Sequence, residues 1–127
     1  MRSYVMPYKN KEDQAAAARR HYDRNKAKIK ARAVEQKRVA LLRNLRFVHD
    51  YLSRNPCVDC GETDPVVLQF DHRDDVVKTI NVSDARRRCW SLKRLSSEIA
   101  KCEVRCANCH ARRTARQFDW YGALDQG

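Results

Sequence analysis

The chain has 127 residues, a length that suits one small domain with an appendage, and a formal net charge of +11. No stretch approaches the ~18 consecutive apolar residues of a membrane span, and the first residues lack the apolar core of a secretory signal. We therefore expect neither a membrane protein nor an exported one. Six cysteines in such a chain favour reduced thiols and bound metal over disulfides, and indicate a cytoplasmic protein.

The positive charge is concentrated in the first part of the chain. Residues 1–55 hold 15 Lys and Arg against 5 Asp and Glu, whereas residues 56–127 hold 12 against 11. A basic arm joined to a nearly neutral domain indicates a polyanionic partner, DNA or RNA. The alternative is a charged, solvated helix that only keeps the chain soluble. We predict an arm over 1–55, a domain over 56–117 and a short tail over 118–127.

The arm is predicted to be one long helix over residues 8–55. Asn10 is the expected N-cap, and Pro56 ends the helix because the residue before proline avoids the α region. An apolar stripe at helical spacing predicts that the second half packs on the domain. The stripe consists of Val34, Leu41, Leu45, Val48 and Leu52, with Leu42 and Phe47 beside it.

Residues 8–33 lack such a stripe, and their basic side chains lie all round the helix. This pattern indicates a segment that projects and contacts nucleic acid, and that orders fully on binding. The basic side chains are Arg19, Arg20, Arg24, Lys26, Lys28, Lys30 and Arg32.

Short elements follow the arm. Cys57 to Gly61 is predicted to form a tight knuckle, in which Gly61 supplies the positive φ of the turn. The β-branched runs 66–70 and 76–82, with a turn at Asp74-Asp75 between them, predict a β-hairpin.

Helices are predicted for most of the remaining chain. Residues 83–101 are expected to be helical, and Ser91 within them is a plausible N-cap. A final helix is expected from about Ala107 to Gln117, carrying Arg112, Arg113 and Arg116 as candidate phosphate contacts.

Two Cys-x-x-Cys pairs predict a structural zinc site. Zinc prefers four soft ligands in a tetrahedron, and each Cys-x-x-Cys turn presents two thiolates to one ion. The alternative is a set of buried free thiols. Because 45 residues separate Cys60 from Cys106, an independent element must lie between the pairs. The predicted ligands are Cys57, Cys60, Cys106 and Cys109, whereas Cys89 and Cys102 are interpreted as small core residues.

A second candidate site combines Asp71, His72 and His110. Adjacent side chains in a strand point to opposite faces, so Asp71 and His72 serve one site only if the strand ends there. A carboxylate and an imidazole suit Mg²⁺ or Mn²⁺, and a neutral imidazole suits a general base acting on water. His110 should point away from the zinc, since one residue along a helix turns about 100°. The alternative is an Asp–His pair that caps a turn.

Asp71-His72, a following strand and Cys106-x-x-Cys109-His110 together resemble an HNH endonuclease of the ββα-metal (His-Me finger) type. The branch is the zinc-knuckle branch common among small phage and prophage proteins, and the resemblance covers about residues 57–117. It implies an α+β fold, with a long basic N-terminal helix followed by a zinc-stapled ββα-metal domain. It also implies a metal-dependent phosphodiesterase that acts on DNA, in the host cell cytoplasm if phage-encoded, and leaves 5′-phosphate and 3′-hydroxyl ends.

The resemblance assigns roles to individual residues. His72 would activate water, while Asp71 and His110 would hold one divalent ion that stabilises negative charge at the phosphate. Lys101 stands where the family usually has its middle asparagine, and would contact a phosphate or tie down the loop. Asn108 is a candidate for a supporting role, or only shapes the knuckle.

Two other functions remain open at the level of sequence. A non-catalytic zinc module that binds DNA or RNA would use the arm, the zinc and the final helix equally well. An accessory subunit of a phage packaging or recombination machine would cleave only with a partner. The sequence predicts no base-reading element, so we expect weak or structure-led specificity. It also does not distinguish nicking from double-strand cutting by a dimer.

Overall fold

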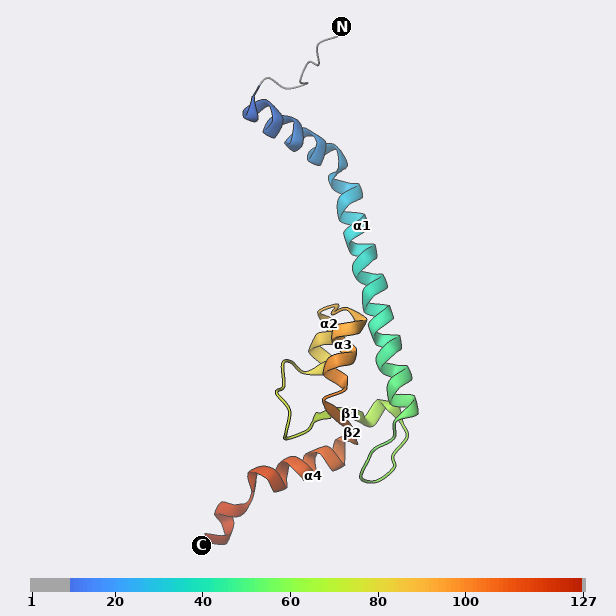
Figure 1. Ribbon diagram of the computed structural model, residues 1–127, viewed down its shortest axis with the longest axis vertical. Helices are drawn as coiled ribbons and strands as arrows, with labels where there is room; N and C mark the ends of the chain where they lie inside the picture. Colours follow the sequence, from blue (N-terminus) through green and yellow to red (C-terminus); the bar gives the residue numbers. More distant parts are fainter. Residues whose placement is uncertain (1–9, 127) are drawn as a thin grey trace. The chain divides into compact units, whose positions relative to one another are not determined.

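The computed structural model describes residues 10–126 and divides the chain into two units, Met1–Arg38 and Val39–Gly127. The long helix α1 (Lys11–Arg54) begins in the first unit and ends in the second (Figure 1). The predicted cap is confirmed, because Asn10 Oδ1 accepts a hydrogen bond from the backbone N–H of Asp13 at 2.9 Å. The part of the predicted helix before Asn10 lies outside the described residues.

The second unit is built around a two-stranded sheet. After α1 the chain runs through a short 3-10 helix, Pro65–Val67, into β1 (Leu68–His72). Two short helices, α2 (Val82–Arg87) and α3 (Leu92–Ile99), precede β2 (Cys102–Cys106). Helix α4 (Ala107–Phe118) follows β2 directly and contacts both strands, while α2 and α3 lie side by side (Figure 1). The fold is therefore α+β, as expected.

The predicted hairpin is wrong in its second strand. β1 pairs antiparallel with β2, with Leu68 opposite Cys106 and His72 opposite Cys102. Residues 76–81 form no strand, and Val82 begins α2. The backbone of this segment bonds to side chains of the 98–101 region instead, since Glu98 accepts from the N–H of Thr79 and Lys101 donates to the carbonyl of Val77. The turn predicted at Asp74-Asp75 is present.

The predicted helix over 83–101 is two helices, and residues 102–106 after it form a strand. The break lies at Cys89, which has a φ of 57° in the left-handed region. Ser91 caps α3 as expected, with its hydroxyl accepting from the N–H of Arg94. The final helix begins at Ala107, as predicted, and extends one residue further than expected, to Phe118.

The core of the second unit consists of two clusters of buried side chains. Leu52, Leu68 and Val104 pack with three cysteines in one cluster, and Leu95 and Ile99 pack with α2 in the other. Phe47, Val48 and Tyr51 on α1 pack against them, so the second half of the predicted stripe is used. Val34, Leu42 and Leu45, by contrast, are exposed. Asn44, which lies between Leu42 and Leu45 in the sequence, is fully buried and donates to the carbonyl of Trp90 at 2.9 Å.

The tail predicted from residue 118 contains a second 3-10 helix, Gly122–Gln126. Its aromatic side chains, Trp120 and Tyr121, are more than half exposed. None of the helices between residues 10 and 126 combines the length and the apolar character that crossing a membrane requires.

Candidate metal centre and candidate active site

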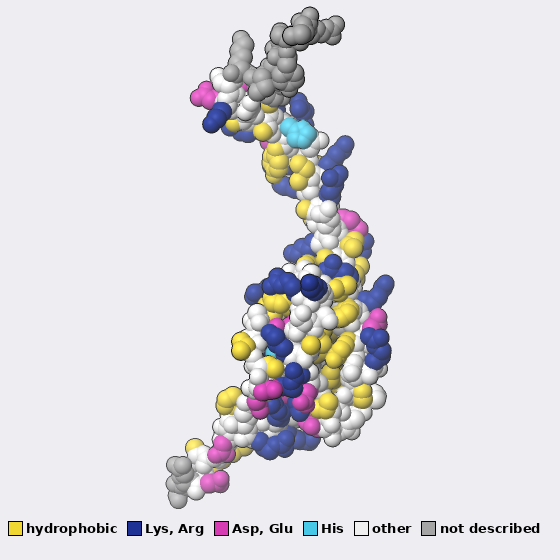
Figure 2. Space-filling view, viewed as in Figure 1, with side chains coloured by type: hydrophobic (Ala, Val, Ile, Leu, Met, Phe, Trp, Pro, Cys, Tyr) yellow, Lys and Arg dark blue, Asp and Glu magenta, His cyan; other side chains and the backbone are white. Residues whose placement is uncertain are grey.

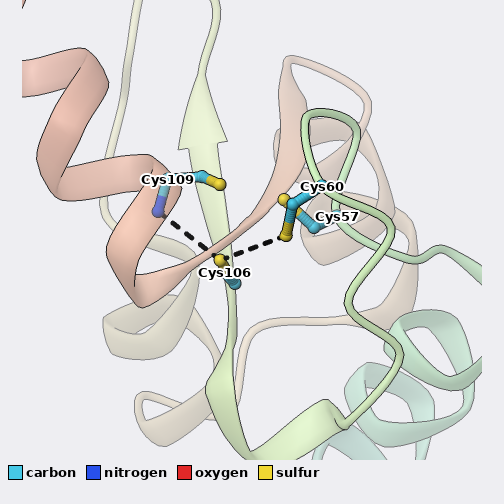
Figure 3. Close-up of side chains that lie close together, drawn as sticks. All are labelled: Cys57, Cys60, Cys106 and Cys109. Carbon is cyan, nitrogen blue, oxygen red and sulfur yellow. Dashed lines mark hydrogen bonds between the residues drawn. The ribbon is translucent and has the colours of Figure 1, made fainter.

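The four cysteines of the two Cys-x-x-Cys pairs converge in space. Their sulfur atoms all lie within 4.8 Å of one another, and Cys60 Sγ is 3.7 Å from Cys106 Sγ (Figure 3). Four sulfurs placed about 2.3 Å from one zinc ion at tetrahedral angles lie about 3.8 Å apart. The donor set and its spacing therefore fit a zinc ion, and the cluster can hold one.

Local backbone structure places each cysteine pair. The turn after α1 carries Cys57 and Cys60, and Gly61 closes it with a φ of 78° and an N–H that donates to the carbonyl of Cys57. Cys106 ends β2 and caps α4, so Cys109 follows in the first turn of that helix. The cluster thus joins the end of α1 to the junction between β2 and α4.

The protein environment favours ionised sulfur at Cys57. Burial by itself would raise its pKa, but hydrogen bonds from the backbone N–H groups of Cys106, Cys60 and Asp59 lower the pKa to about 6. The Cys106 side chain and burial raise the pKa of Cys109 to about 12. Together the four sulfurs cannot all ionise without a cation, so binding of a metal ion would release protons and stabilise the fold.

Asp71 and His110 are brought together on one face of β1. His110 Nε2 lies 3.5 Å from Asp71 Oδ1, and His110 Nδ1 lies 2.8 Å from Gln69 Oε1. Gln69 and Asp71 are two residues apart in β1, so they point to the same face, toward α4. His110 is not part of the cysteine cluster and contacts Gln69 and Asp71 instead, which agrees with the prediction from the sequence.

Two arginines also hold the Asp71 carboxylate, which is only 7% exposed. Arg105 donates to Asp71 Oδ2 at 3.0 Å, and Arg113 donates to both oxygens at 3.1 and 3.2 Å. Arg113 also pairs with Asp74 at 2.8 Å. The Asp71 carboxylate is therefore held by two guanidinium groups, each of which also pairs with at least one other carboxylate.

Arg105 connects this carboxylate to the cysteine knuckle. Its Nε donates to Asp59 Oδ2 at 2.8 Å, and its Nη2 donates to Glu103 Oε2 at 2.7 Å. Asp59 lies between the two cysteines of the first pair. Order in the knuckle and the position of Asp71 are consequently coupled through one guanidinium group.

His72 lies on the opposite face of β1 from Asp71. It is the last residue of the strand, and its Nε2 lies 2.8 Å from Glu98 Oε1. The His72 and Glu98 side chains are 11% and 3% exposed. The structure therefore joins Asp71 to His110 but gives His72 a different carboxylate partner.

Hydrogen bonds within the fold hold Lys101, whereas Asn108 lies on the surface. The Lys101 ammonium donates to Glu98 Oε2, to the carbonyl of Val77 and to Thr79 Oγ1, at 2.9 to 3.1 Å. Of its two predicted roles, Lys101 fulfils the one that ties down the loop. Asn108 is exposed and lines a shallow groove beside Cys60, Cys106 and Cys109.

The predicted nucleic-acid contacts are all on the surface except one. Arg113 is held by Asp71 and Asp74, whereas Arg112 and Arg116 are exposed. The seven basic residues of the arm are exposed and make no ion pair within the described residues, and Figure 2 shows Lys and Arg along this unit. They are Arg19, Arg20, Arg24, Lys26, Lys28, Lys30 and Arg32.

Glu98, Arg105 and Gln69 were not predicted from the sequence. Glu98 had a usable signal, because it shares the helical spacing of Leu95, Ile99 and Cys102 and is thus an acidic residue on an apolar face. The sequence holds no comparable signal for Arg105 and Gln69, because the partners of these residues depend on which strands pair.

Comparison with protein-family models found no match. Searches of curated proteins and of solved structures likewise found no significant similarity. What this chain does must therefore be inferred from its own side chains.

Proposed function

We propose that this protein is a divalent-metal-dependent endonuclease of the HNH type that hydrolyses phosphodiester bonds in DNA. The observation that carries the proposal is the approach of Asp71 Oδ1 and His110 Nε2 to 3.5 Å beside a four-cysteine cluster. The arrangement of elements in space supports it, because β1 pairs with β2, and β2 leads directly into the helix that carries His110, although α2 and α3 separate the two strands in the sequence. That is the strand–strand–helix arrangement which the resemblance implies.

The Asp71–His110 pair suits a divalent ion in chemistry and nearly in spacing. Adjacent ligands at 2.0–2.1 Å from an octahedral ion lie about 3 Å apart, roughly half an ångström closer than here. With its Nδ1–H donated to Gln69, a neutral His110 presents the lone pair of Nε2 to the Asp71 carboxylate. Two acceptors that face each other favour a cation between them. Mg²⁺ and Mn²⁺ commonly take few protein ligands and complete their shell with water and phosphate oxygens.

Each residue has a role in the proposed reaction. His72 would accept a proton from the attacking water, and Asp71 and His110 would hold the ion. Because His72 and Asp71 lie on opposite faces of β1, the two roles can meet in one site only at the end of the strand, where His72 is the last residue. Once bound, that ion supplies positive charge that stabilises the developing negative charge at the phosphate. Arg112, Arg116 and the basic arm bind flanking phosphates, which orients the DNA without reading its sequence. Asn108 would act only through the knuckle.

One observation favours a second function, that of a non-catalytic zinc module that binds DNA. Asp71 is already satisfied by Arg105 and Arg113, and His72 by Glu98. A structural network would show the same pairing without any need for a metal. A requirement for a phage packaging or recombination partner is a variant of the main proposal, in which cleavage depends on that partner.

Arg113→Ala is expected to strengthen Mn²⁺ binding at the Asp71–His110 pair by about tenfold, because a competing positive charge is removed. Isothermal titration of the zinc-loaded protein with Mn²⁺ measures this affinity. Arg112→Ala is the matched control, because Arg112 is an exposed neighbour on the same helix. This variant should leave the Mn²⁺ affinity unchanged. Equal or weaker Mn²⁺ binding by Arg113→Ala would argue against a metal site at Asp71.

Replacing the seven basic residues of the arm by glutamine should flatten the salt dependence of DNA binding. Each phosphate that the protein neutralises contributes about 0.9 to the slope of log K against log salt, so removing several of these charges changes the slope measurably. Glutamine has a helix propensity close to that of Lys and Arg. The control replaces each Lys by Arg and each Arg by Lys at the same positions. Fluorescence anisotropy with labelled duplex DNA gives both slopes. An unchanged slope would remove the arm from the DNA interface.

The nature of the cut ends tests the proposed reaction. Nicked circles produced by the protein should be sealed by DNA ligase without prior phosphorylation, because hydrolysis is expected to leave 5′-phosphate and 3′-hydroxyl ends. Nicks that ligase seals only after end repair would indicate a different chemistry.

A further inference from the structure

We propose that Glu98 is a positioning residue that orients the His72 imidazole and fixes the proton on its Nε2, which leaves Nδ1 as the atom that accepts a proton. This inference rests on the proposed function for the role of His72. The contact itself, 2.8 Å between His72 Nε2 and Glu98 Oε1, is independent of that role. Neither residue lies among the cysteine ligands.

Glu98 is held as a buried anion by four donors. Its Oε1 accepts from the backbone N–H groups of Thr79 and Ile80 at 3.0 and 3.5 Å, besides facing His72. Its Oε2 accepts from the Lys101 ammonium at 2.9 Å. The side chain is 3% exposed. A carboxylate with this many donors is fixed in position as well as in charge.

The charge of Glu98 determines the hydrogen bond to His72. Burial by itself would raise the pKa of Glu98, but hydrogen bonds from Lys101, His72 and Thr79 outweigh it and lower the pKa to about 2. At neutral pH the carboxylate carries no proton and can only accept. The Nε2 of His72 must therefore be the donor, and in the neutral ring the proton cannot be on Nδ1.

The same carboxylate also orders the segment between β1 and α2. Thr79, Ile80 and Lys101 all bind it, so Glu98 joins the end of β1 to the connection that follows. A purely structural role would need only these contacts. A positioning role predicts in addition that the ring proton of His72 depends on the acceptor at residue 98.

Proton NMR of zinc-loaded, ¹⁵N-histidine-labelled protein at about pH 8 tests the inference, with His72 assigned from His72→Ala. A hydrogen-bonded, slowly exchanging Nε2–H signal is expected for His72. It should persist in Glu98→Gln, whose amide oxygen still accepts, and vanish in Glu98→Leu, which fills the space without an acceptor. Lys101→Met loosens the connection but leaves the acceptor, and should keep the signal. Loss of the signal in Lys101→Met as well, or its survival in Glu98→Leu, would overturn the inference.

Single-turnover cleavage supplies the second measurement. Glu98→Leu is expected to slow cleavage by about 10–100-fold with DNA affinity unchanged, and Glu98→Gln to recover most of that loss. Wild-type rates in folded Glu98→Leu would overturn the positioning role while leaving the nuclease proposal intact. If the wild-type protein does not cleave DNA, the nuclease proposal fails, and the ring proton alone decides whether Glu98 orients His72.

Discussion

Removal of zinc is expected to abolish the cooperative thermal unfolding of the unit Val39–Gly127. Cys57, Cys106 and Cys109 are buried in the same cluster as Leu52, Leu68 and Val104, so the metal site and the core form together. Structural zinc contributes about 10–16 kcal/mol of apparent binding energy in zinc-finger peptides, which exceeds the stability of most small domains. Circular dichroism melts before and after chelation measure the effect, beside a zinc assay expected to give one ion per chain.

Substitution separates the metal ligands from the other thiols. Cys106→Ser should lose zinc and the melting transition, whereas Cys89→Ser should keep both, because Cys89 lies outside the cluster in the break between α2 and α3. A chelated protein that melts like the zinc-loaded one would show that the cluster is not a structural metal site.

Asp71→Asn, His72→Ala and His110→Ala are each expected to slow DNA cleavage by about 10²–10⁴-fold. The variants Asp71→Asn and His110→Ala would lose the proposed ion, and His72→Ala would lose the proposed base. The two ligand changes should combine non-additively, since either one empties the same site. DNA affinity should stay nearly constant, because the arm supplies most phosphate contacts. Single-turnover rates and anisotropy, measured on the same preparations, give both quantities.

His49→Ala is the matched control for these variants. His49 is exposed on α1 and lies beside Asp50, so it offers a histidine–aspartate pair without the proposed site. Its cleavage rate should equal that of the wild type. Normal rates in both Asp71→Asn and His110→Ala would exclude this pair as the catalytic metal site.

Elements defined by local signals were predictable from the sequence. Asn10 and Ser91 cap helices through their own neighbours, and Cys106 caps α4 with its sulfur. The two Cys-x-x-Cys pairs were equally predictable as candidate metal ligands, since such a turn sets the geometry of two ligands within four residues. In each case the residues that form the feature are close in the sequence.

The pairing of the strands was not predictable in the same way. Residues 76–82 have the higher β propensity, but Val77 is 84% exposed and the segment bonds to Glu98 and Lys101 instead. β2 carries the charged residues Glu103 and Arg105 in its middle. It becomes a strand because Arg105 reaches three carboxylates and because the cysteines fix its end. Tertiary contacts thus override local preference.

The candidate site was predictable in part for the same reason. The motif identified Asp71 and His110, and the structure brings them together. The groups that hold them, Arg105 and Arg113, and the partner of His72, Glu98, depend on the pairing of β1 with β2 and on the packing of α3 and α4. Such partners are long-range, and one sequence contains no pattern that specifies them.

The most direct measurement incubates zinc-loaded protein with supercoiled plasmid in Mg²⁺, Mn²⁺ or EDTA, beside His72→Ala purified identically. We predict nicked circles that require the divalent ion and are absent with His72→Ala. Nicking that persists with His72→Ala would contradict the assignment of the base. Failure of the wild-type protein to nick in either metal, together with a salt-sensitive gel shift by both proteins, would contradict the nuclease and favour a zinc module that only binds DNA.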